Sequence, residues 1–131
     1  MIEESARLRI QHRFHFTGFL RGQQLEQLYA MADLFVMSSV SEPFGLTPFE
    51  AMRYNIPVLV SKQAGAAELI SPDALVDFWD IDLMAQKMLF FSQNEKGRAD
   101  LIAGQKTMLV DLSWSLVAQK LKGIYQRVVN S

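Results

Sequence analysis

Apolar and polar positions along the first sixty residues predict helices that alternate with short strands. Some segments repeat apolar residues every three or four positions, as amphipathic helices do, whereas others alternate or run apolar without interruption, as strands do. Uninterrupted runs are typical of parallel strands that are buried on both faces. The predicted elements are, in order, a helix over 2–11, a strand over 13–17, a helix over 23–32, a strand over 33–37, a helix over 47–54 and a strand over 57–61.

The second half continues this alternation and ends in helices. The predicted elements are a short helix over 65–70, an edge strand over 74–78, a helix from Asp80 to 92, a helix after Asn94 to 110 and a last helix from Ser113. Asp80 is well suited to cap the helix that follows it. The last helix carries apolar residues along one face, so we expect that face, including Trp114, to pack against the protein. The whole pattern predicts an α/β fold, a partial Rossmann-like parallel sheet flanked by helices.

Composition and charge exclude several classes of protein. The chain has 131 residues, half of them apolar, which is enough for one domain with a core. Its 13 basic and 14 acidic residues are dispersed, so we expect no nucleic-acid partner. It has no cysteine, no apolar run long enough for a transmembrane segment and no signal-peptide pattern, so we expect a cytoplasmic location. The two histidines, His12 and His15, form no metal or catalytic pattern.

The run from Ser41 to Met52 concentrates the candidate chemistry. Glu42 and Glu50 place one carboxylate on a loop and another near a helix start, and Gly45 between them lets backbone come close to a ligand. Both carboxylates follow a buried strand, and open α/β sheets bind ligands outside the carboxyl ends of their strands. Because an ionised carboxylate accepts hydrogen bonds from two hydroxyls at once, this run suits a nucleotide sugar.

Part of this run also has a purely structural interpretation. The tetrapeptide at 47–50, Thr-Pro-Phe-Glu, has the form of a capping box with proline at the first helical position. On that interpretation Glu50 is only a cap. A cap requires neither Gly45 nor Glu42, however, so these two residues carry the functional hypothesis.

In order and spacing, the chain resembles the retaining glycosyltransferases of the GT-B fold, a group that includes sucrose synthases, bacterial glycogen synthases and mannosyltransferases. In that family the corresponding stretch reads Ser, Glu, two residues, Phe-Gly-Leu, two or three residues, and Glu-Ala-Met, which residues 41–52 match closely. The other matching segments are 16–20, 29–33, 57–60, Gly65 with Glu68, and 112–114. The resemblance therefore covers nearly the whole chain.

The resemblance implies roles for the matching residues. It implies that Glu42 contacts hydroxyls of the donor sugar in catalysis and that Glu50 holds the ribose hydroxyls of the nucleotide. It implies that backbone amides of Gly45, Leu46 and Thr47 face the diphosphate at the positive end of a helix.

The same resemblance implies the remaining parts of the site and the reaction. Leu20, with Gly18 beside it, lies where the family presents backbone to the base, and Gly65 and Glu68 match positions near the donor. The implied reaction transfers a sugar from a nucleotide diphosphate to a saccharide or lipid acceptor with retained anomeric configuration. No cofactor or metal is implied besides the donor substrate.

Two departures from the family pattern matter. Position 48 is proline, so one amide is absent, and the hydroxyl of Thr47 would compensate for it. The two strands and the helix that open the family's C-terminal domain, with the Arg and Lys that clamp the diphosphate there, have no counterpart. We therefore expect residues 1–131 to be one incomplete C-terminal domain, without the N-terminal acceptor domain and inactive alone.

The absent strands predict a gap in the sheet. In the doubly wound order 3-2-1-4-5-6 the first two strands are central, so the strands predicted at 13–17 and 33–37 should not pair with each other. Their apolar edges would then be exposed and would favour aggregation or pairing with another chain.

Two other functions remain open at this point. One is a nucleotide-sugar 2-epimerase, which shares the fold and the donor site but whose usual histidine and carboxylate pattern is not evident. The other is a non-catalytic nucleotide-sugar-binding module, for which the absent Arg and Lys would be natural. For a full-length enzyme, association with the membrane periphery is a further possibility.

Overall fold

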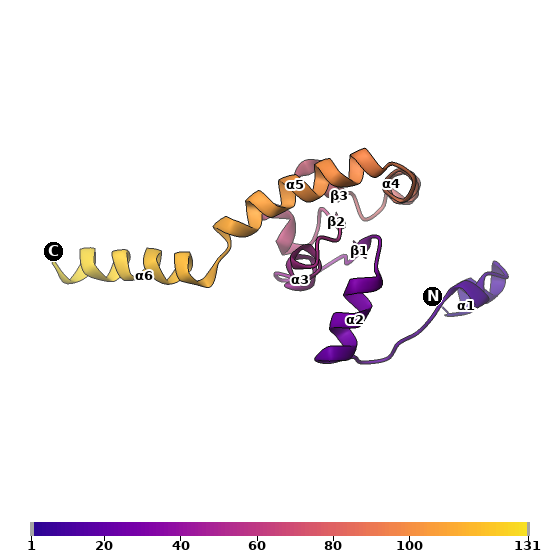
Figure 1. Ribbon diagram of the computed structural model, residues 1–131, viewed down its shortest axis with the longest axis horizontal. Helices are drawn as coiled ribbons and strands as arrows, with labels where there is room; N and C mark the ends of the chain where they lie inside the picture. Colours follow the sequence, from indigo (N-terminus) through magenta and orange to yellow (C-terminus); the bar gives the residue numbers. More distant parts are fainter. Residues whose placement is uncertain (1, 131) are drawn as a thin grey trace.

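A short parallel sheet lies at the centre of the molecule, and both ends of the chain extend away from it (Figure 1). The computed structural model describes residues 2–130, apart from the side chain of Asp111. The strands are β1 (Phe35–Met37), β2 (Val58–Ser61) and β3 (Leu75–Val76), and they form one sheet in the order β1-β2-β3. Both pairings are parallel. The predicted α/β class with a parallel sheet is confirmed.

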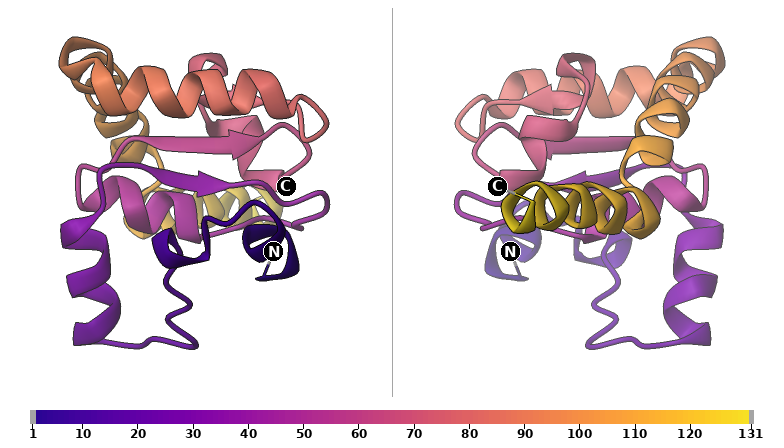
Figure 2. Two further views of the ribbon diagram at one scale, coloured as in Figure 1. Left: turned by 90° about the vertical axis from the view of Figure 1, so that its right-hand side faces the viewer. Right: turned by 90° about the vertical axis from the view of Figure 1, so that its left-hand side faces the viewer.

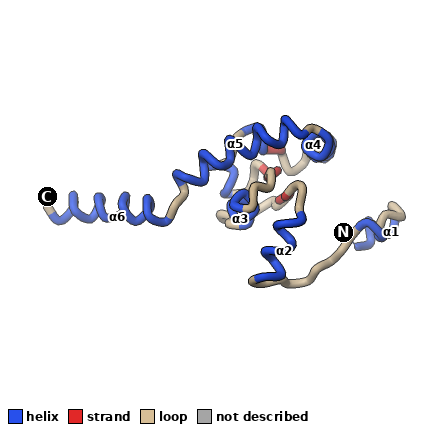
Figure 3. Tube along the Cα trace, viewed as in Figure 1, coloured by secondary structure: helices blue, strands red, loops and turns tan. Residues whose placement is uncertain are grey.

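Helices account for most of the remaining chain, as Figure 3 shows. The α-helices are α1 (Ile2–Arg7), α2 (Gln23–Met31), α3 (Thr47–Arg53), α4 (Ile81–Gln93), α5 (Glu95–Asp111) and α6 (Trp114–Val129). The 3-10 helices are η1 (Gln11–Arg13), η2 (Gly65–Leu69) and η3 (Pro72–Ala74), so the short helix predicted at 65–70 is 3-10 rather than α. Helix α3 contacts both β1 and β2 and packs against α5, which in turn packs against α4.

Strand β2 forms the middle of the core because it has a neighbour on each side. Val58, Leu59 and Val60 are fully buried, as their uninterrupted apolar run predicts. Helix α5 is fixed to the start of this strand by the buried side chain of Gln105. With its amide oriented to satisfy both groups, Gln105 donates to Ile56 O at 3.2 Å and accepts from the Val58 amide at 3.1 Å.

The predicted starts of α4 and α6 are confirmed, and each has a side-chain cap. The Asp80 carboxylate accepts from the Leu83 amide at 2.9 Å and opens α4. In the same way, the Ser113 hydroxyl opens α6. Asn55 follows α3 with a φ of 59°, the left-handed conformation expected of it.

The strand predicted at 13–17 is wrong. These residues follow η1 as an open segment that leads to α2, and Phe14 and Phe16 are exposed and stacked on each other with ring centroids 6.4 Å apart. A strand requires a neighbour for its backbone groups, and within residues 2–130 none lies beside this segment. As expected, it does not pair with β1. Because β1 is therefore an edge strand, Phe35 and Val36 are half-buried rather than buried on both faces.

The predicted packing of the last helix is also wrong for the described residues. Helix α6 extends beyond the sheet and lies apart from the other elements (Figure 1). Its apolar face is exposed, and Trp114 has an exposed fraction of 83%. The amphipathic pattern of α6 is real, but no element of residues 2–130 covers it.

Candidate functional site

The loop between β1 and α3, residues 38–46, lies at the carboxyl edge of the sheet. Both strands of the pair end at this edge, as the two views of Figure 2 show, and the loop returns to the start of α3 there. Within it, Glu42 forms an isolated parallel bridge with Ala64, which follows β2. The Gly65 amide donates to the Glu42 carbonyl at 2.9 Å. The connection after β2 thus holds the middle of this loop.

The structure brings Glu42 and Gly45 together inside this loop. Gly45 has a φ of 78°, which side chains rarely adopt. A Cβ on Gly45 would lie 3.0 Å from Glu42 Cγ and 3.0 Å from the end of Met37. The stem of the Glu42 side chain therefore crosses close to the backbone of Gly45, and glycine is required there for both reasons.

The start of α3 differs from the predicted capping box. The helix begins at Thr47 itself, so Leu46 holds the capping position and provides no side-chain bond. The Thr47 hydroxyl instead donates to Met37 Sδ at 3.7 Å. Within residues 2–130 the amides of Leu46 and Thr47 make no hydrogen bond. Glu50 consequently lies one position too far along the helix for the role that the capping box predicted.

Glu50 instead faces a hollow between α2 and α3. The Tyr29 hydroxyl donates to Glu50 Oε2 at 3.3 Å, and the ring of Tyr29 stacks on Tyr54 with centroids 5.4 Å apart. Burial, together with the negative charge of Glu50, raises the pKa of Tyr29 above its ordinary value. The hollow has a volume of about 400 Å³ and is lined by Gly22, Leu25, Glu26, Tyr29, Glu50, Arg53 and Tyr54.

The sequence did not predict the bond from Tyr29 to Glu50. Tyr29 was predicted as part of the helix at 23–32 and of the matching segment at 29–33, and no role was predicted for Arg53 and Tyr54, which line the same hollow. The available signal was that Tyr29 lies on the apolar face of α2, where a hydroxyl must find an acceptor when it is buried.

Gly18 and Leu20 do not lie with Glu42. They belong to the open segment that reaches the far end of α2 (Figure 1), and among the described residues no hydrogen bond joins them to the loop at 38–46. Gly18 has a φ of 66° and open space around its Cα. Gly22, two residues after Leu20, does line the hollow that Glu50 faces. The segment thus reaches the edge of that hollow without completing it.

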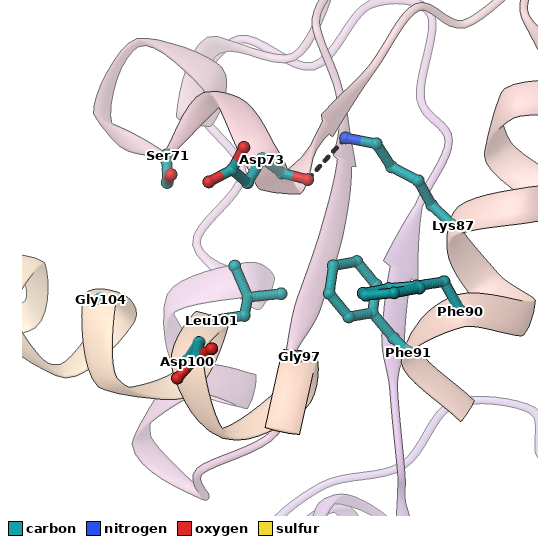
Figure 4. Close-up of a pocket in the computed structure, with 9 residues that line it drawn as sticks. All are labelled: Ser71, Asp73, Lys87, Phe90, Phe91, Gly97, Asp100, Leu101 and Gly104. Carbon is teal, nitrogen blue, oxygen red and sulfur yellow. Dashed lines mark hydrogen bonds between the residues drawn. The ribbon is translucent and has the colours of Figure 1, made fainter. Parts of the chain in front are cut away.

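A second hollow, of about 420 Å³, lies between η3, α4 and α5 (Figure 4). Lys87 stands at its rim and donates to the carbonyls of Asp73 at 2.6 Å and Leu75 at 3.2 Å. These bonds fasten β3 to α4. The hollow shares no lining residue with the one that Glu50 faces.

Neither a metal cluster nor a membrane-spanning helix is found in the part of the chain that the structure describes. Residues 2–130 contain no group of three or more His, Cys, Asp or Glu side chains placed to hold a metal ion. None of the helices described is both long and apolar enough to cross a membrane.

A parallel sheet whose carboxyl edge carries a glycine-containing loop with a carboxylate, followed by a helix, is typical of open α/β proteins, a class that binds ligands at that edge. Comparison with known proteins specifies the family. The chain belongs to the glycosyl transferases group 1, whose family model matches residues 1–108. The expected resemblance to glycosyltransferases is confirmed.

Curated relatives are also glycosyltransferases. An uncharacterized glycosyltransferase of Methanocaldococcus jannaschii is 29% identical over 91% of this chain and 32% of its own length. The serotype-specific mannosyltransferase WbdA of Escherichia coli is 32% identical over 88% of this chain and 14% of its own length. The chain therefore spans about a third or less of these relatives.

Two solved structures share the fold. Sucrose-phosphate synthase from Thermosynechococcus elongatus superposes with a TM-score of 0.79 at 22% identity, covering 98% of this chain and 33% of that one. Anabaena HepE in complex with UDP superposes with a TM-score of 0.72 at 24% identity, covering 95% of this chain and 35% of that one. The expected GT-B type of fold is confirmed.

Proposed function

We propose that this chain binds a nucleotide-diphosphate sugar at the carboxyl edge of its sheet and acts in transfer of the glycosyl group with retention of configuration. The observation that carries the proposal is the geometry of the loop at 38–46. Glu42 lies folded over Gly45 at this edge, and the left-handed conformation of Gly45 turns the chain back toward α3 there. The next helix carries Glu50 on a side that faces a hollow.

Each residue has a role that suits its chemistry. The carboxylate of Glu42 accepts hydrogen bonds from donor-sugar hydroxyls, and Glu50 accepts from the ribose hydroxyls. The amides of Gly45, Leu46 and Thr47 donate to the diphosphate and stabilise its charge as the glycosidic bond breaks. Gly18 and Leu20 present backbone to the base, which requires their segment to fold inward from its open position.

The relatives support a nucleotide sugar as the donor. HepE was solved with UDP, and a relative from Mycolicibacterium smegmatis that is 31% identical over 87% of this chain is a GDP-mannose-dependent mannosyltransferase. Membership of the family supports glycosyl transfer in general. We propose a saccharide or lipid as the acceptor, held by a separate N-terminal domain, and no metal or further cofactor.

We also propose that residues 1–131 alone bind the donor without transferring the sugar. An acceptor site requires a second wall above the carboxyl edge, and within residues 2–130 no element covers the exposed side chains of Phe44 and Leu46 there. We propose that the protein is located in the cytoplasm. The alternative is that the full-length enzyme associates with the membrane periphery.

Isothermal titration calorimetry tests the proposal. The chain is titrated with UDP, GDP and ADP and with UDP-glucose, GDP-mannose and ADP-glucose. Glu50→Ala is expected to raise the dissociation constant of every ligand that the wild type binds by about tenfold or more. The reason is that the ribose hydroxyls lose a charged acceptor, whose hydrogen bond contributes about 1.5 to 3 kcal/mol. Glu42→Gln is expected to weaken the binding of the sugar nucleotides only and to leave that of the free nucleotides unchanged.

Glu26→Gln provides the matched control, because Glu26 lines the same hollow as Glu50 but follows no family motif. It is expected to leave all dissociation constants within about twofold. The proposal fails if the folded wild-type chain binds none of the six ligands, or if Glu26→Gln and Glu50→Ala weaken binding equally.

A further inference from the structure

We infer that Gly65 is a positioning residue for Glu42: its missing side chain sets where the loop at 38–46 lies and so where the Glu42 carboxylate meets the sugar. This inference rests on the proposed function. Gly65 is the first residue of η2, after β2, and makes no contact with the hollow that Glu50 faces.

The contact between Gly65 and the loop is one of backbone against backbone. A Cβ on Gly65 would lie 2.1 Å from the Pro43 carbonyl oxygen, 2.8 Å from its carbonyl carbon and 3.0 Å from Phe44 Cα. The Gly65 amide simultaneously donates to the Glu42 carbonyl at 2.9 Å. Three consecutive residues of the loop are therefore located by a single glycine.

Strain at Gly65 itself does not explain the glycine. The left-handed glycines of the described chain are Gly18, Gly22 and Gly45, and Gly65 is not among them. Its backbone conformation is one that alanine adopts as well. The requirement for glycine at position 65 therefore comes from the close approach of the loop alone.

If position 65 gains a side chain, the loop must move, because η2 cannot. Ala64 and Ala66, which flank Gly65, have exposed fractions of 2% and 0%, so η2 is anchored in the core. On the other side of the contact, Pro43 is exposed and Phe44 has an exposed fraction of 45%. The compliant partner is thus the loop that carries Glu42.

The size of the displacement follows from ordinary contact distances. Carbon and carbonyl oxygen approach to about 3.3 Å in proteins, so a methyl group at position 65 displaces the Pro43 carbonyl by about 1 Å. Glu42 precedes Pro43 directly and moves with it. A misplacement of about 1 Å in a substrate-positioning group costs up to about 100-fold in rate or affinity for the affected state. Glu50 lies on α3 and is not displaced by this contact.

The experiment is a double-mutant cycle between Gly65→Ala and Glu42→Gln, read as the ratio of the dissociation constants of UDP and UDP-glucose. The pairs GDP with GDP-mannose and ADP with ADP-glucose are measured in parallel. Either single variant is expected to reduce this ratio by about tenfold. The double variant is expected to reduce it no further, because a displaced Glu42 has no contact left to lose. A general loss of structure would instead weaken the binding of both the nucleoside diphosphate and its sugar nucleotide, and their ratio would not change.

Gly104→Ala is the matched control. Gly104 lies in α5 with nothing within 4 Å of an added Cβ, so the same methyl group is added without any clash. It is expected to leave the ratio unchanged and to raise the urea midpoint, because alanine favours a helix over glycine by about 1 kcal/mol.

The outcomes separate this inference from the proposed function. Additive losses in the double variant, or an unchanged ratio in folded Gly65→Ala, overturn the role of Gly65 while donor binding stands. Failure of the wild type to bind any of the six ligands overturns the proposed function and this inference with it. If Gly65→Ala does not fold, amide hydrogen exchange of the wild type decides: exchange at Gly65 as fast as at the exposed Gly18 overturns the contact, and slower exchange supports it.

Discussion

A single hydroxyl links the two helices that border the hollow faced by Glu50. Tyr29 is 8% exposed and donates to the Glu50 carboxylate, so its neutral form is favoured by both burial and the neighbouring negative charge. The hydroxyl also keeps the Glu50 carboxylate on the side of α3 where we propose that it meets the ribose. Tyr29 thus serves stability and the site at once.

The raised pKa of Tyr29 predicts how stability changes with pH. Since the folded pKa lies above the value of about 10 in the unfolded chain, the stabilisation is complete below pH 10 and is lost as pH rises above it. Tyr29→Phe is expected to be less stable than the wild type by about 1 kcal/mol at pH 7. The difference in urea midpoint should narrow between pH 10 and pH 11.

Tyr125→Phe is the control for this measurement, because the side chain of Tyr125 is 66% exposed on α6. It should change neither the midpoint nor its pH dependence. If the difference in urea midpoint between the wild type and Tyr29→Phe stays constant from pH 7 to 11, the carboxylate of Glu50 does not affect the pKa of Tyr29.

Residues whose role depends on local chemistry were predictable, and those that depend on distant partners were not. Gly45 was singled out from its place in the motif, and its left-handed φ together with the close approach of Glu42 accounts for a glycine there. Thr47 was predicted to cap α3, yet its hydroxyl reaches Met37, a residue whose proximity arises only from the return of the loop. The bond from Tyr29 to Glu50 joins two helices and could not be read from either one alone.

Among the elements, α4 and α6 begin with the same device but differ in what surrounds them. Asp80 caps α4, which packs on α5 and fastens β3 through Lys87. Ser113 caps α6, whose apolar face is exposed. The same type of cap should therefore affect global stability in the first helix and only local helicity in the second.

Alanine substitutions test this difference. Asp80→Ala is expected to lower the free energy of unfolding by about 1 kcal/mol, because α4 unfolds together with the core. Ser113→Ala is expected to reduce helical circular dichroism with no measurable change in the urea midpoint, because α6 frays independently of the core. Equal shifts of the midpoint in both variants would mean that α6 is coupled to the core.

Two of the predicted strands were located less well than the last three helices, and the reason is physical. Helices satisfy their backbone groups internally, so periodicity and caps at Asp80, Asn94 and Ser113 were enough to locate α4, α5 and α6. A strand exists only beside another strand. The alternating residues 13–17 have no neighbour in the described chain, and the strand predicted at 74–78 is limited to the two residues that pair with β2.

For the whole molecule, the main consequence of the fold is exposed apolar surface at several places. Phe14, Phe16, Trp114 and Leu121 all have exposed fractions above 40%, and β1 offers an unpaired strand edge. The class and order of the sheet were predictable because each buried strand has its own apolar run. Which faces remain uncovered depends on the assembled molecule and was predicted only for the edge of the sheet.

We expect this surface to cause self-association of the isolated chain. The weight-average mass from light scattering should rise with concentration, and Leu121→Glu should reduce the rise, because a charge on the apolar face of α6 opposes its burial. Gln119→Glu is the control, since it adds the same charge to the same helix at a residue that is already polar. If both variants behave alike, net charge rather than the apolar face governs association.

The hydrogen bond from Gly65 to Glu42 also has a consequence for the order of folding. It joins the connections that follow β1 and β2, and these strands are adjacent only after the chain has crossed over through α3. The bond cannot form before β1 and β2 lie side by side, because their pairing brings the two connections together. The sheet therefore matures before the loop at 38–46 does, and refolding followed by pulsed hydrogen exchange should protect the amides of β2 earlier than that of Gly65.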